Sequence, residues 1–296
     1  MEPASGEGEG LVRAFKRRVR SVLPDSVVAI RMHAAVHGGY PNVLRPSTFN
    51  EKVLFRKIFD RRPILTQFHD KLRVRDYVAE RLGDGVLPKL LVATERPETI
   101  PFDVLPDKFV VKPSHASGLV TIVTDRRGID REAIIAECRA WLRTDYYRQT
   151  RERVYRDIPR RIMVEAFIDD GTGGAPNDYK FFVFDGKVRL IQVDAGRFAE
   201  HRRSFFDTDW RRLDFTLLYH PIAGDVPRPP HLAQMVAAAE RLGQGIDFIR
   251  VDLYDTEPRF YFGEITTCPG SGLERFHPVE YDRHVGAFWQ LARARR

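Results

Sequence analysis

Residues 250–272 carry the strongest architectural signal in this chain: Arg250-Val-Asp-Leu-Tyr-Asp-Thr-Glu-Pro-Arg-Phe-Tyr-Phe-Gly-Glu264-Ile-Thr-Thr-Cys-Pro-Gly-Ser-Gly272. The pattern predicts two strands, Phe248–Tyr254 and Arg259–Ile265, joined by a polar turn. Each strand carries one carboxylate, Asp252 and Glu264. Magnesium takes one or two carboxylates and completes its shell with water and phosphate oxygens. This pair is therefore a candidate seat for Mg²⁺ and a nucleoside triphosphate.

The two carboxylates can share a metal only if they lie on the same face of the sheet. Side chains alternate across a strand, so the length of the turn sets their relative orientation. A four-residue turn over Asp255–Pro258 directs Asp252 and Glu264 to opposite faces, whereas a three- or five-residue turn directs them to one face. The metal hypothesis therefore requires an odd turn or a β-bulge. The alternative is two ordinary strand carboxylates, solvated or paired with Lys or Arg.

The composition is that of a globular protein, with 43% hydrophobic and 30% charged residues in a chain of 296. No apolar run approaches the roughly 18–20 residues of a membrane span. The two cysteines lie far apart and form no disulfide framework, so the expected compartment is the reducing cytoplasm. A net charge of +7 favours anionic partners such as nucleotides, acidic sugars or lipid head groups. No zinc-finger or RNA-recognition spacing is present, so nucleic acid is not expected.

The N-terminal third is expected to be largely helical after a disordered tail at 1–10. Residues 11–23 predict a short basic amphipathic helix, which either packs on the protein's own core or contacts an anionic membrane. Thr48 and Glu51 form a capping-box pattern at the start of the next helix. A further helix is expected over about Pro63–Leu82.

A strand at 106–112 runs into the small-residue loop Ser114–Gly118, and a second strand at 119–124 returns from it. Such a flap can cover phosphates with its backbone N–H groups. Lys112 ends the first strand, where it either binds phosphate as a point charge or is an exposed strand-end lysine. A short strand is also expected at 86–92, before this pair.

A helical segment is expected at 131–156, a strand at 161–168 and a flexible loop at 171–176. Glu165 ends the strand, where it either accepts hydrogen bonds from a ligand or is solvated. Asp178 and Lys180 alternate with aromatic residues and so share a face, as a polar site or as the wet side of a sheet. The turn Asp185-Gly186 predicts a β-hairpin, and 232–242 predicts an amphipathic helix.

Together these segments resemble the ATP-grasp superfamily, and most closely its TupA-like members of bacterial surface-polysaccharide biosynthesis. The resemblance covers roughly residues 40–290. It rests on the order of six segments: Pro46-Ser-Thr-Phe-Asn-Glu-Lys52, Asp70-Lys71 with Arg75-Asp-Tyr-Val, Phe109-Val-Val-Lys112 with His115 and Ser117-Gly118, Asn177-Asp-Tyr-Lys-Phe-Phe182, Arg250-Val-Asp-Leu-Tyr254, and Gly263-Glu-Ile-Thr266 with Pro269-Gly-Ser-Gly272.

The resemblance implies an α/β (α+β) fold in which two lobes grip ATP between antiparallel sheets, with a helical N-terminal extension. The implied divisions are a tail and helical region at 1–69, a small lobe with the phosphate flap at 70–172, and a large lobe with the magnesium site at 173–296.

The resemblance also implies roles for individual residues. Those implied to bind ATP are Lys71, Lys112, Ser114, His115, Ser117 and Gly118 around the phosphates, and Glu165, Ala166 and Phe167 at the adenine end. Those implied to act on the transferred group are Arg250, Lys180 and Asp178. Asp252 and Glu264 match magnesium ligands, and Thr266 stands where many relatives have asparagine, which weakens a second metal position.

The function implied is ATP- and Mg²⁺-dependent carboxylate–amine ligation through an acylphosphate. The substrate would be an acidic sugar or amino acid, free or glycan-linked, in the synthesis of a bacterial surface polysaccharide. Two alternatives stay open: a kinase that phosphorylates a sugar hydroxyl, and a non-catalytic nucleotide-binding module. The sequence gives no sign of the oligomeric state.

Overall fold

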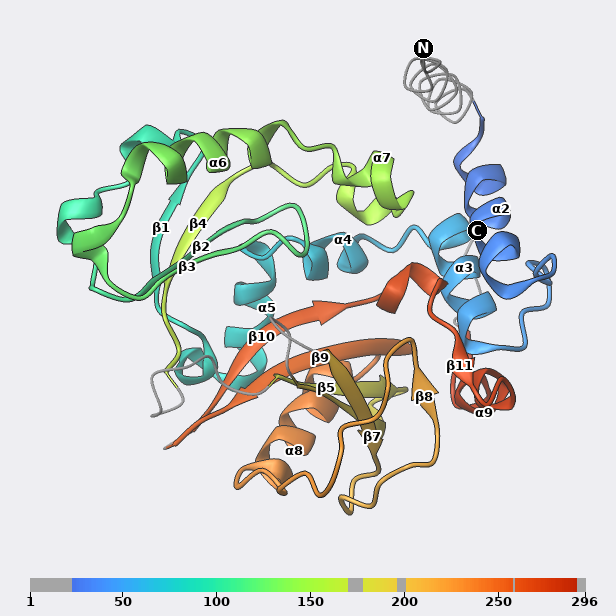
Figure 1. Ribbon diagram of the computed structural model, residues 1–296. Coiled ribbons are helices and arrows are strands. Elements are labelled where there is room, and N and C mark those ends of the chain that lie inside the picture. Colours follow the sequence, from blue (N-terminus) through green and yellow to red (C-terminus); the bar gives the residue numbers. More distant parts are fainter. Residues whose placement is uncertain (1–22, 170–177, 196–200, 258, 292–296) are drawn as a thin grey trace, which may run out of the picture.

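The computed structural model describes residues 23–169, 178–195, 201–257 and 259–291 (Figure 1). The α-helices are α2 (Asp25–His37), α3 (Phe49–Phe59), α4 (Pro63–His69), α5 (Arg73–Leu82), α6 (Arg131–Arg143), α7 (Tyr146–Thr150), α8 (Leu232–Gly243) and α9 (Glu280–Ala287). The strands are β1 (Leu90–Thr94), β2 (Phe109–Pro113), β3 (Thr121–Val123), β4 (Ile162–Ala166), β5 (Asp178–Phe184), β6 (Lys187–Ala195), β7 (Arg202–Phe206), β8 (Thr216–Leu217), β9 (Phe248–Asp255), β10 (Phe260–Thr266) and β11 (Phe276–His277). The short 3₁₀ turns are η1 (Asp84–Val86), η2 (Pro97–Thr99), η3 (Phe102–Val104), η4 (Arg126–Gly128), η5 (Arg153–Tyr155) and η6 (Pro269–Gly272).

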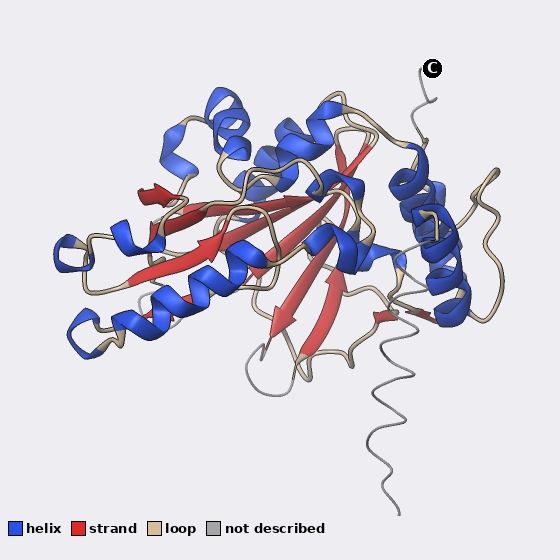
Figure 2. Cartoon of the chain, turned by 90° about the horizontal axis from the view of Figure 1, so that it is seen from above, coloured by secondary structure: helices blue, strands red, loops and turns tan. Residues whose placement is uncertain are grey.

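Two antiparallel sheets form the framework, as the sequence predicts. The smaller sheet has the strand order β1-β4-β2-β3, and the larger has the order β10-β9-β5-β6-β7. Strands β8 and β11 pair separately. In Figure 1, α6 covers the smaller sheet, α8 covers the larger one, and α4 and α5 lie between the two sheets. Figure 2 shows the same strands from above, flanked by helices.

One face of the larger sheet is apolar because side chains alternate along each strand. Tyr179, Phe181 and Val183 of β5 belong to one buried cluster with three apolar residues of β9, Ile249, Val251 and Leu253. Helix α8 completes the cluster with side chains that recur at helical spacing: Leu232, Met235, Ala239 and Leu242. This face of the larger sheet carries a buried core.

The opposite face of β5 changes character halfway along the strand. Phe182 and Phe184 belong to a second buried cluster with Phe49 of α3 and Trp289, just beyond α9. Burying one such ring contributes about 1.5–3 kcal/mol. Asp178 and Lys180 precede these rings on the same face and are also buried, among charged rather than apolar groups. The candidate site forms around them.

The capping box that begins α3 is confirmed. The Thr48 hydroxyl accepts a hydrogen bond from the backbone N–H of Glu51, and the Glu51 carboxylate accepts one from the backbone N–H of Thr48. The single helix predicted over Pro63–Leu82 is wrong at its centre, since α4 ends at His69. The Asp70 carboxylate accepts hydrogen bonds from the N–H groups of the next residues, including that of Leu72 at 3.0 Å. These bonds favour a turn there over a continuous helix.

The continuous helix predicted at 131–156 is also wrong. Helix α6 ends at Arg143, and Asp145 caps the short helix α7 by accepting the Arg148 N–H at 3.0 Å. The first strand is not at 86–92 but at Leu90–Thr94, because residues 84–86 form a 3₁₀ turn and Pro88 has no N–H for a ladder. The predicted Asp185-Gly186 hairpin is confirmed between β5 and β6.

The sequence analysis did not anticipate α2, α9, β7, β8 or β11. The tail at 1–10, the predicted helix at 11–23 and the predicted loop at 171–176 lie outside the described residues. No helix in the part of the chain that the structure describes is both long and apolar enough to cross a membrane. The lobe boundaries at 70 and 173 stay predictions.

Candidate active site

A β-bulge brings the two predicted metal ligands together. The turn between β9 and β10 spans residues 256–259, an even number that alone would direct Asp252 and Glu264 to opposite faces. The register shifts at Gly263, so Glu264 lies directly opposite Asp252 on one face. The bulge that the metal hypothesis requires is therefore present. Glycine suits it, since a Cβ at 263 would lie 2.9 Å from the Tyr254 ring.

Two cations hold the Asp252 carboxylate. Arg250 donates to both of its oxygens, from Nε at 2.8 Å and from Nη2 at 2.7 Å, and Lys180 Nζ donates at 3.0 Å. Burial alone would raise the pKa of Asp252, but the charges of Arg250 and Lys180 lower it below the usual value. The carboxylate is therefore ionised and fixed in direction, as a metal ligand must be.

Lys180 lies among three aspartates, one of which the sequence analysis missed. It contacts Asp178 and Asp252 directly, and its Nζ lies 3.9 Å from Asp194 Oδ2. Asp194 pairs with Asp178 in the β5–β6 ladder only because β6 also contains a bulge, at Arg189. That bulge is the reason the hairpin signal alone could not place Asp194 on this face.

The ion-pair network around Asp252 is rich in carboxylates. Among the described side chains, five carboxylates lie in ion pairs with four Lys or Arg cations, and His201 Nε2 lies 3.2 Å from Asp194 Oδ1. The carboxylates are Asp178, Asp194, Asp252, Glu264 and Glu274, and the cations are Lys71, Lys180, Arg203 and Arg250. Carboxylate oxygens gathered in this way fit a hard divalent cation.

The side-chain oxygens at this site are too few to complete the coordination shell of a metal ion, so a bound metal would need further ligands. No group of three or more His, Cys, Asp or Glu side chains within the described ranges could hold a metal by itself. Asp252 and Glu264 supply two carboxylates, and the Thr266 hydroxyl lies 3.4 Å from Glu264 Oε1. Such a partial shell is typical of Mg²⁺ bound together with phosphate and water.

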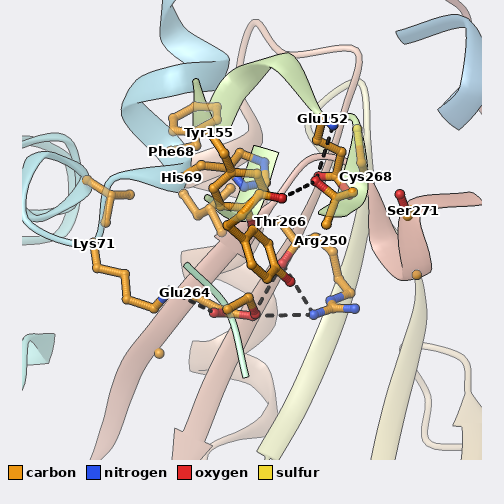
Figure 3. Close-up of a pocket in the computed structure, with 17 residues that line it drawn as sticks. Phe68, His69, Lys71, Glu152, Tyr155, Arg250, Glu264, Thr266, Cys268 and Ser271 are labelled. Atoms are coloured by element: carbon orange, nitrogen blue, oxygen red, sulfur yellow. Dashed lines mark hydrogen bonds and ion pairs between the residues drawn. The ribbon is translucent and has the colours of Figure 1, made fainter. Parts of the chain in front are cut away.

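Glu264 opens into a cavity of about 200 Å³ beside β10 (Figure 3). Its side chain is 32% exposed, against 3% for Asp252. Lys71 and Arg250 point toward Glu264 from opposite sides, with nitrogen–oxygen distances of 4.0 and 3.6 Å. Lys71 Nζ also donates to the Ala116 carbonyl at 2.6 Å. Lys71 therefore joins the end of the cavity that contains Glu264 and Arg250, here called the metal end, to the predicted phosphate flap.

Lys112 and Glu165 lie together on the smaller sheet. Glu165 Oε2 is 2.5 Å from Lys112 Nζ, and Glu165 Oε1 accepts from Arg75 at 2.8 Å. Ala166 and Phe167 follow Glu165 at the end of β4. The ring of Phe167 lies 5.7 Å from the Lys108 ammonium. The structure thus groups the predicted adenine-end residues with Lys112, while their contact with a nucleotide stays a prediction.

The predicted flap residues have different surroundings. The Ser114 hydroxyl donates to the Pro159 carbonyl at 3.2 Å, and a His115 ring nitrogen lies 3.2 Å from the Trp141 carbonyl, so both side chains are engaged with main chain. Ser117 lines the cavity, and Gly118 has φ 76°, which favours glycine. Of these, Ser117 and the backbone at Gly118 are the better placed to meet a ligand.

Several residues that line the cavity were not among the site residues predicted from the sequence. They are His69, Tyr146, Glu152, Tyr155, Cys268 and Ser271. Glu152 and Tyr155 come from the segment predicted as continuous helix, where only the break after α7 turns them inward. In the sequence, the one sign that Glu152 could belong to the site was its place as a polar residue next to a helix end.

Residues 51–290 match the model of the TupA-like ATP-grasp family. No curated protein matches the chain. Similar solved structures include D-alanine–D-alanine ligase from Bacillus anthracis complexed with ATP, at 18% identity and TM-score 0.42 over 70% of this chain and 56% of that chain. Another is L-amino acid ligase from Bacillus licheniformis, at 15% identity and TM-score 0.41 over 78% of this chain and 44% of that chain.

This chain therefore spans about half the length of those two enzymes. The family model, in contrast, covers most of the present sequence, from the capping box of α3 to the segment after α9. By that match the chain belongs to the TupA-like ATP-grasp family.

Proposed function

We propose that this protein is an ATP- and Mg²⁺-dependent carboxylate–amine ligase that works through an acylphosphate. The observation that carries the proposal is the bulge at Gly263, which sets Asp252 and Glu264 on one face with Arg250 beside both. Membership of an ATP-grasp family supports an ATP-dependent ligase. The acid would be a sugar acid or an acidic amino acid, free or glycan-linked, in surface-polysaccharide synthesis.

In the proposed reaction the substrate carboxylate attacks the γ-phosphorus of ATP, and ADP leaves. Lys71, Lys112 and Arg250 offset the charge of the triphosphate and of the acylphosphate. Mg²⁺ held by Asp252 and Glu264, with Thr266 nearby, would offset further phosphate charge when bound. An amine then displaces phosphate from the acyl carbon and forms the amide. No protein nucleophile is needed.

Asp178 and Lys180 act in this proposal by positioning. Lys180 holds Asp252 from the neighbouring strand, and Asp178 holds Lys180. Glu165, Ala166 and Phe167 would line the adenine end, and the loop Ser114–Gly118, with His115 and Ser117, would close over the phosphates. Closure excludes water, which would otherwise hydrolyse the acylphosphate.

The test is Mg²⁺-dependent ADP release with a panel of uronic acids and acidic amino acids, each with and without hydroxylamine. Hydroxylamine converts an acylphosphate into a hydroxamate. We expect one acid to give both ADP and hydroxamate, and Asp252→Asn to lose both. ADP with a phosphorylated sugar and no hydroxamate would identify a kinase. Nucleotide binding without ADP from any substrate would identify a binding module.

We also propose where in the cell the protein lies. A cytoplasmic enzyme is proposed from the cysteine content, and peripheral membrane contact is proposed for residues 11–23 from their basic amphipathic pattern. Co-sedimentation with anionic liposomes, using the full chain and a chain lacking residues 1–23, tests the second. Equal sedimentation of both chains would exclude the membrane contact.

A further inference from the structure

The cavity has a second end that the proposed function does not use. Figure 3 shows Lys71, Glu264 and Arg250 at one end and Glu152, Cys268 and Ser271 toward the other. Among the described residues that line the cavity, Glu264 and Glu152 are the carboxylates. Glu264 belongs to the metal end, so the role of Glu152 is open.

Glu152 is held in the cavity wall by specific contacts. Arg151 adopts a left-handed conformation, φ 58°, which turns the chain at the end of α7. The Glu152 N–H then donates to the Thr150 hydroxyl at 3.2 Å. Glu152 is 5% exposed and lines the cavity together with Ser271. A carboxylate built into a cavity wall in this way is a functional candidate.

Ser271 is held in place at the same end of the cavity. Lys57 Nζ donates to its hydroxyl oxygen at 2.6 Å and to its carbonyl at 3.2 Å. Because the hydroxyl accepts from Lys57, its own proton can be donated to an acceptor in the cavity. Ser271 has φ 57° between Gly270 and Gly272, which also have positive φ. This left-handed turn costs about 1–3 kcal/mol for a residue such as serine, a strain often found at binding sites.

The other titratable groups near this end are poor proton acceptors at neutral pH. Burial lowers the pKa of His69 to about 3, and the Nε2 of its ring already contacts Thr267. Burial raises the pKa of the Cys268 thiol to about 12 and also raises that of Tyr155. Burial raises the pKa of Glu152 too, against the opposing effects of Lys57 and Ser271, which makes it a stronger base than a solvated glutamate.

We propose that this end of the cavity receives the amine substrate as a primary ammonium ion and that Glu152 takes one of its protons. The inference rests on the proposed ligase function. The ammonium loses one proton to the Glu152 carboxylate, and the free amine attacks the acyl carbon of the acylphosphate. As the C–N bond forms, the bond from that carbon to the phosphate oxygen breaks. The second amine proton leaves with the phosphate, and the proton on Glu152 returns to water.

A purely structural role for Glu152 makes different predictions. In that case the carboxylate would only anchor the turn Pro269–Gly272, and its loss would loosen the turn beside the metal end. Acylphosphate formation and amide formation would then fall together, and the folded state would lose stability. If Glu152 instead takes a proton from the ammonium ion, its loss should affect only the step in which the amine forms the amide.

The experiment compares the full chain with Glu152→Gln, which keeps the shape and removes the charge. The probes are hydroxylamine, which is uncharged at neutral pH, and a panel of ammonium chloride, amino acids, amino sugars and diamines. We expect hydroxamate formation to be unchanged, and kcat/KM for the best amine of the panel to fall about 100-fold. Ser271→Ala should likewise leave hydroxamate formation unchanged and lower kcat/KM for the amine, but by a smaller factor. Glu137→Gln, an exposed glutamate of α6, is the matched control.

Thermal unfolding completes the test, because Glu152→Gln should be as stable as the wild type or more stable. An equal loss of hydroxamate and amide, or a clear drop in Tm, would overturn the role of Glu152. A wild type that forms hydroxamate but no amide with any panel amine would overturn the ammonium seat. A wild type that forms no hydroxamate with any acid would instead contradict the ligase function itself.

Discussion

Two aspartates with little-exposed side chains lie close together in the chain, Asp247 just before strand β9 and Asp252 within it. Each accepts hydrogen bonds from two cations. Asp247 accepts from Arg56 and Arg62, both at 2.7 Å, and from the Trp289 indole at 2.9 Å. Asp252 accepts from Arg250 and Lys180 at similar distances. By burial and pairing alone the two positions are alike. Their surroundings are not.

Around Asp247 the two arginines are engaged by several partners. Arg56 also donates to the carbonyls of Phe248 and Thr267 at 2.8 and 3.1 Å, and its guanidinium lies 4.4 Å from the Trp289 ring centre. Asp60 is the second carboxylate, so two acids balance two arginines. The Asp252 network, by contrast, opens on a cavity through Glu264, whose side chain is 32% exposed. An opening on a cavity therefore distinguishes a candidate site from a structural ion pair better than burial does.

The largest expected effect comes from breaking the balanced cluster. Asp247→Ala leaves Arg56 buried with one distant carboxylate, Asp60 Oδ2 at 3.6 Å. We expect the free energy of unfolding to fall by about 3–5 kcal/mol, as for other buried pairs that lose one partner. Urea unfolding measures this loss. ADP release per folded molecule should stay at the wild-type level, and a selective loss of activity would show that the two clusters do not differ as described.

Asp252→Asn should show the reverse pattern. Lys180 keeps Asp178 and Asp194, and Arg250 keeps Glu264 at 3.6 Å, so neither cation is left without an acid. We expect ADP release to fall about 10²–10³-fold, with less than about 1 kcal/mol lost in urea unfolding. A large loss of stability with activity intact would place Asp252 with Asp247 among structural residues.

Acid should weaken the balanced cluster in a defined pH window. Burial alone would raise the pKa of Asp247, but the charge of Arg56 and hydrogen bonds from Trp289 and Arg62 lower it from 3.8 to about 2. The stabilisation is therefore present above about pH 4 and is lost as pH falls through about 2, a total of about 2 kcal/mol. The stability advantage of wild type over Asp247→Asn, measured in urea from pH 6 downward, should shrink in that window. An advantage that is independent of pH would refute the assignment.

Most strands of the two larger sheets could be predicted from sequence, and Asp252 and Glu264 could be singled out as a facing pair, because alternation and turn signals are local. What could not be predicted is the register. Bulges at Arg189 and Gly263 each insert one residue, and each reverses the face of everything beyond it. Asp194 was missed for that reason. Glu152 was missed because its direction depends on a single left-handed residue, Arg151, whose conformation no sequence pattern indicates.

The bulge at Gly263 is also the feature that distinguishes Asp252 from Asp247, because it places the Glu264 carboxylate directly opposite Asp252. Gly263→Ala tests it directly. A Cβ there would lie 2.9 Å from the Tyr254 ring and 3.0 Å from the Asp252 carbonyl oxygen, and the backbone oxygen cannot turn away as a side chain can. We expect about 1–2 kcal/mol of destabilisation from overpacking, the smallest stability effect of the series apart from that of Asp252→Asn. Gly128→Ala is the matched control, because nothing lies within 4 Å of its Cβ.

Activity should respond to Gly263→Ala more than stability does. If the strand relieves the clash by moving Glu264 away from Asp252, the two carboxylates no longer share a face and ADP release falls, while the Asp247 cluster is untouched. Unchanged ADP release would mean that the metal end does not depend on the facing pair. Mg²⁺ titration of the ATP reaction separates these outcomes, because a displaced Glu264 should raise the Mg²⁺ concentration needed for half-maximal activity, whereas a merely loosened fold would lower the maximum at every concentration.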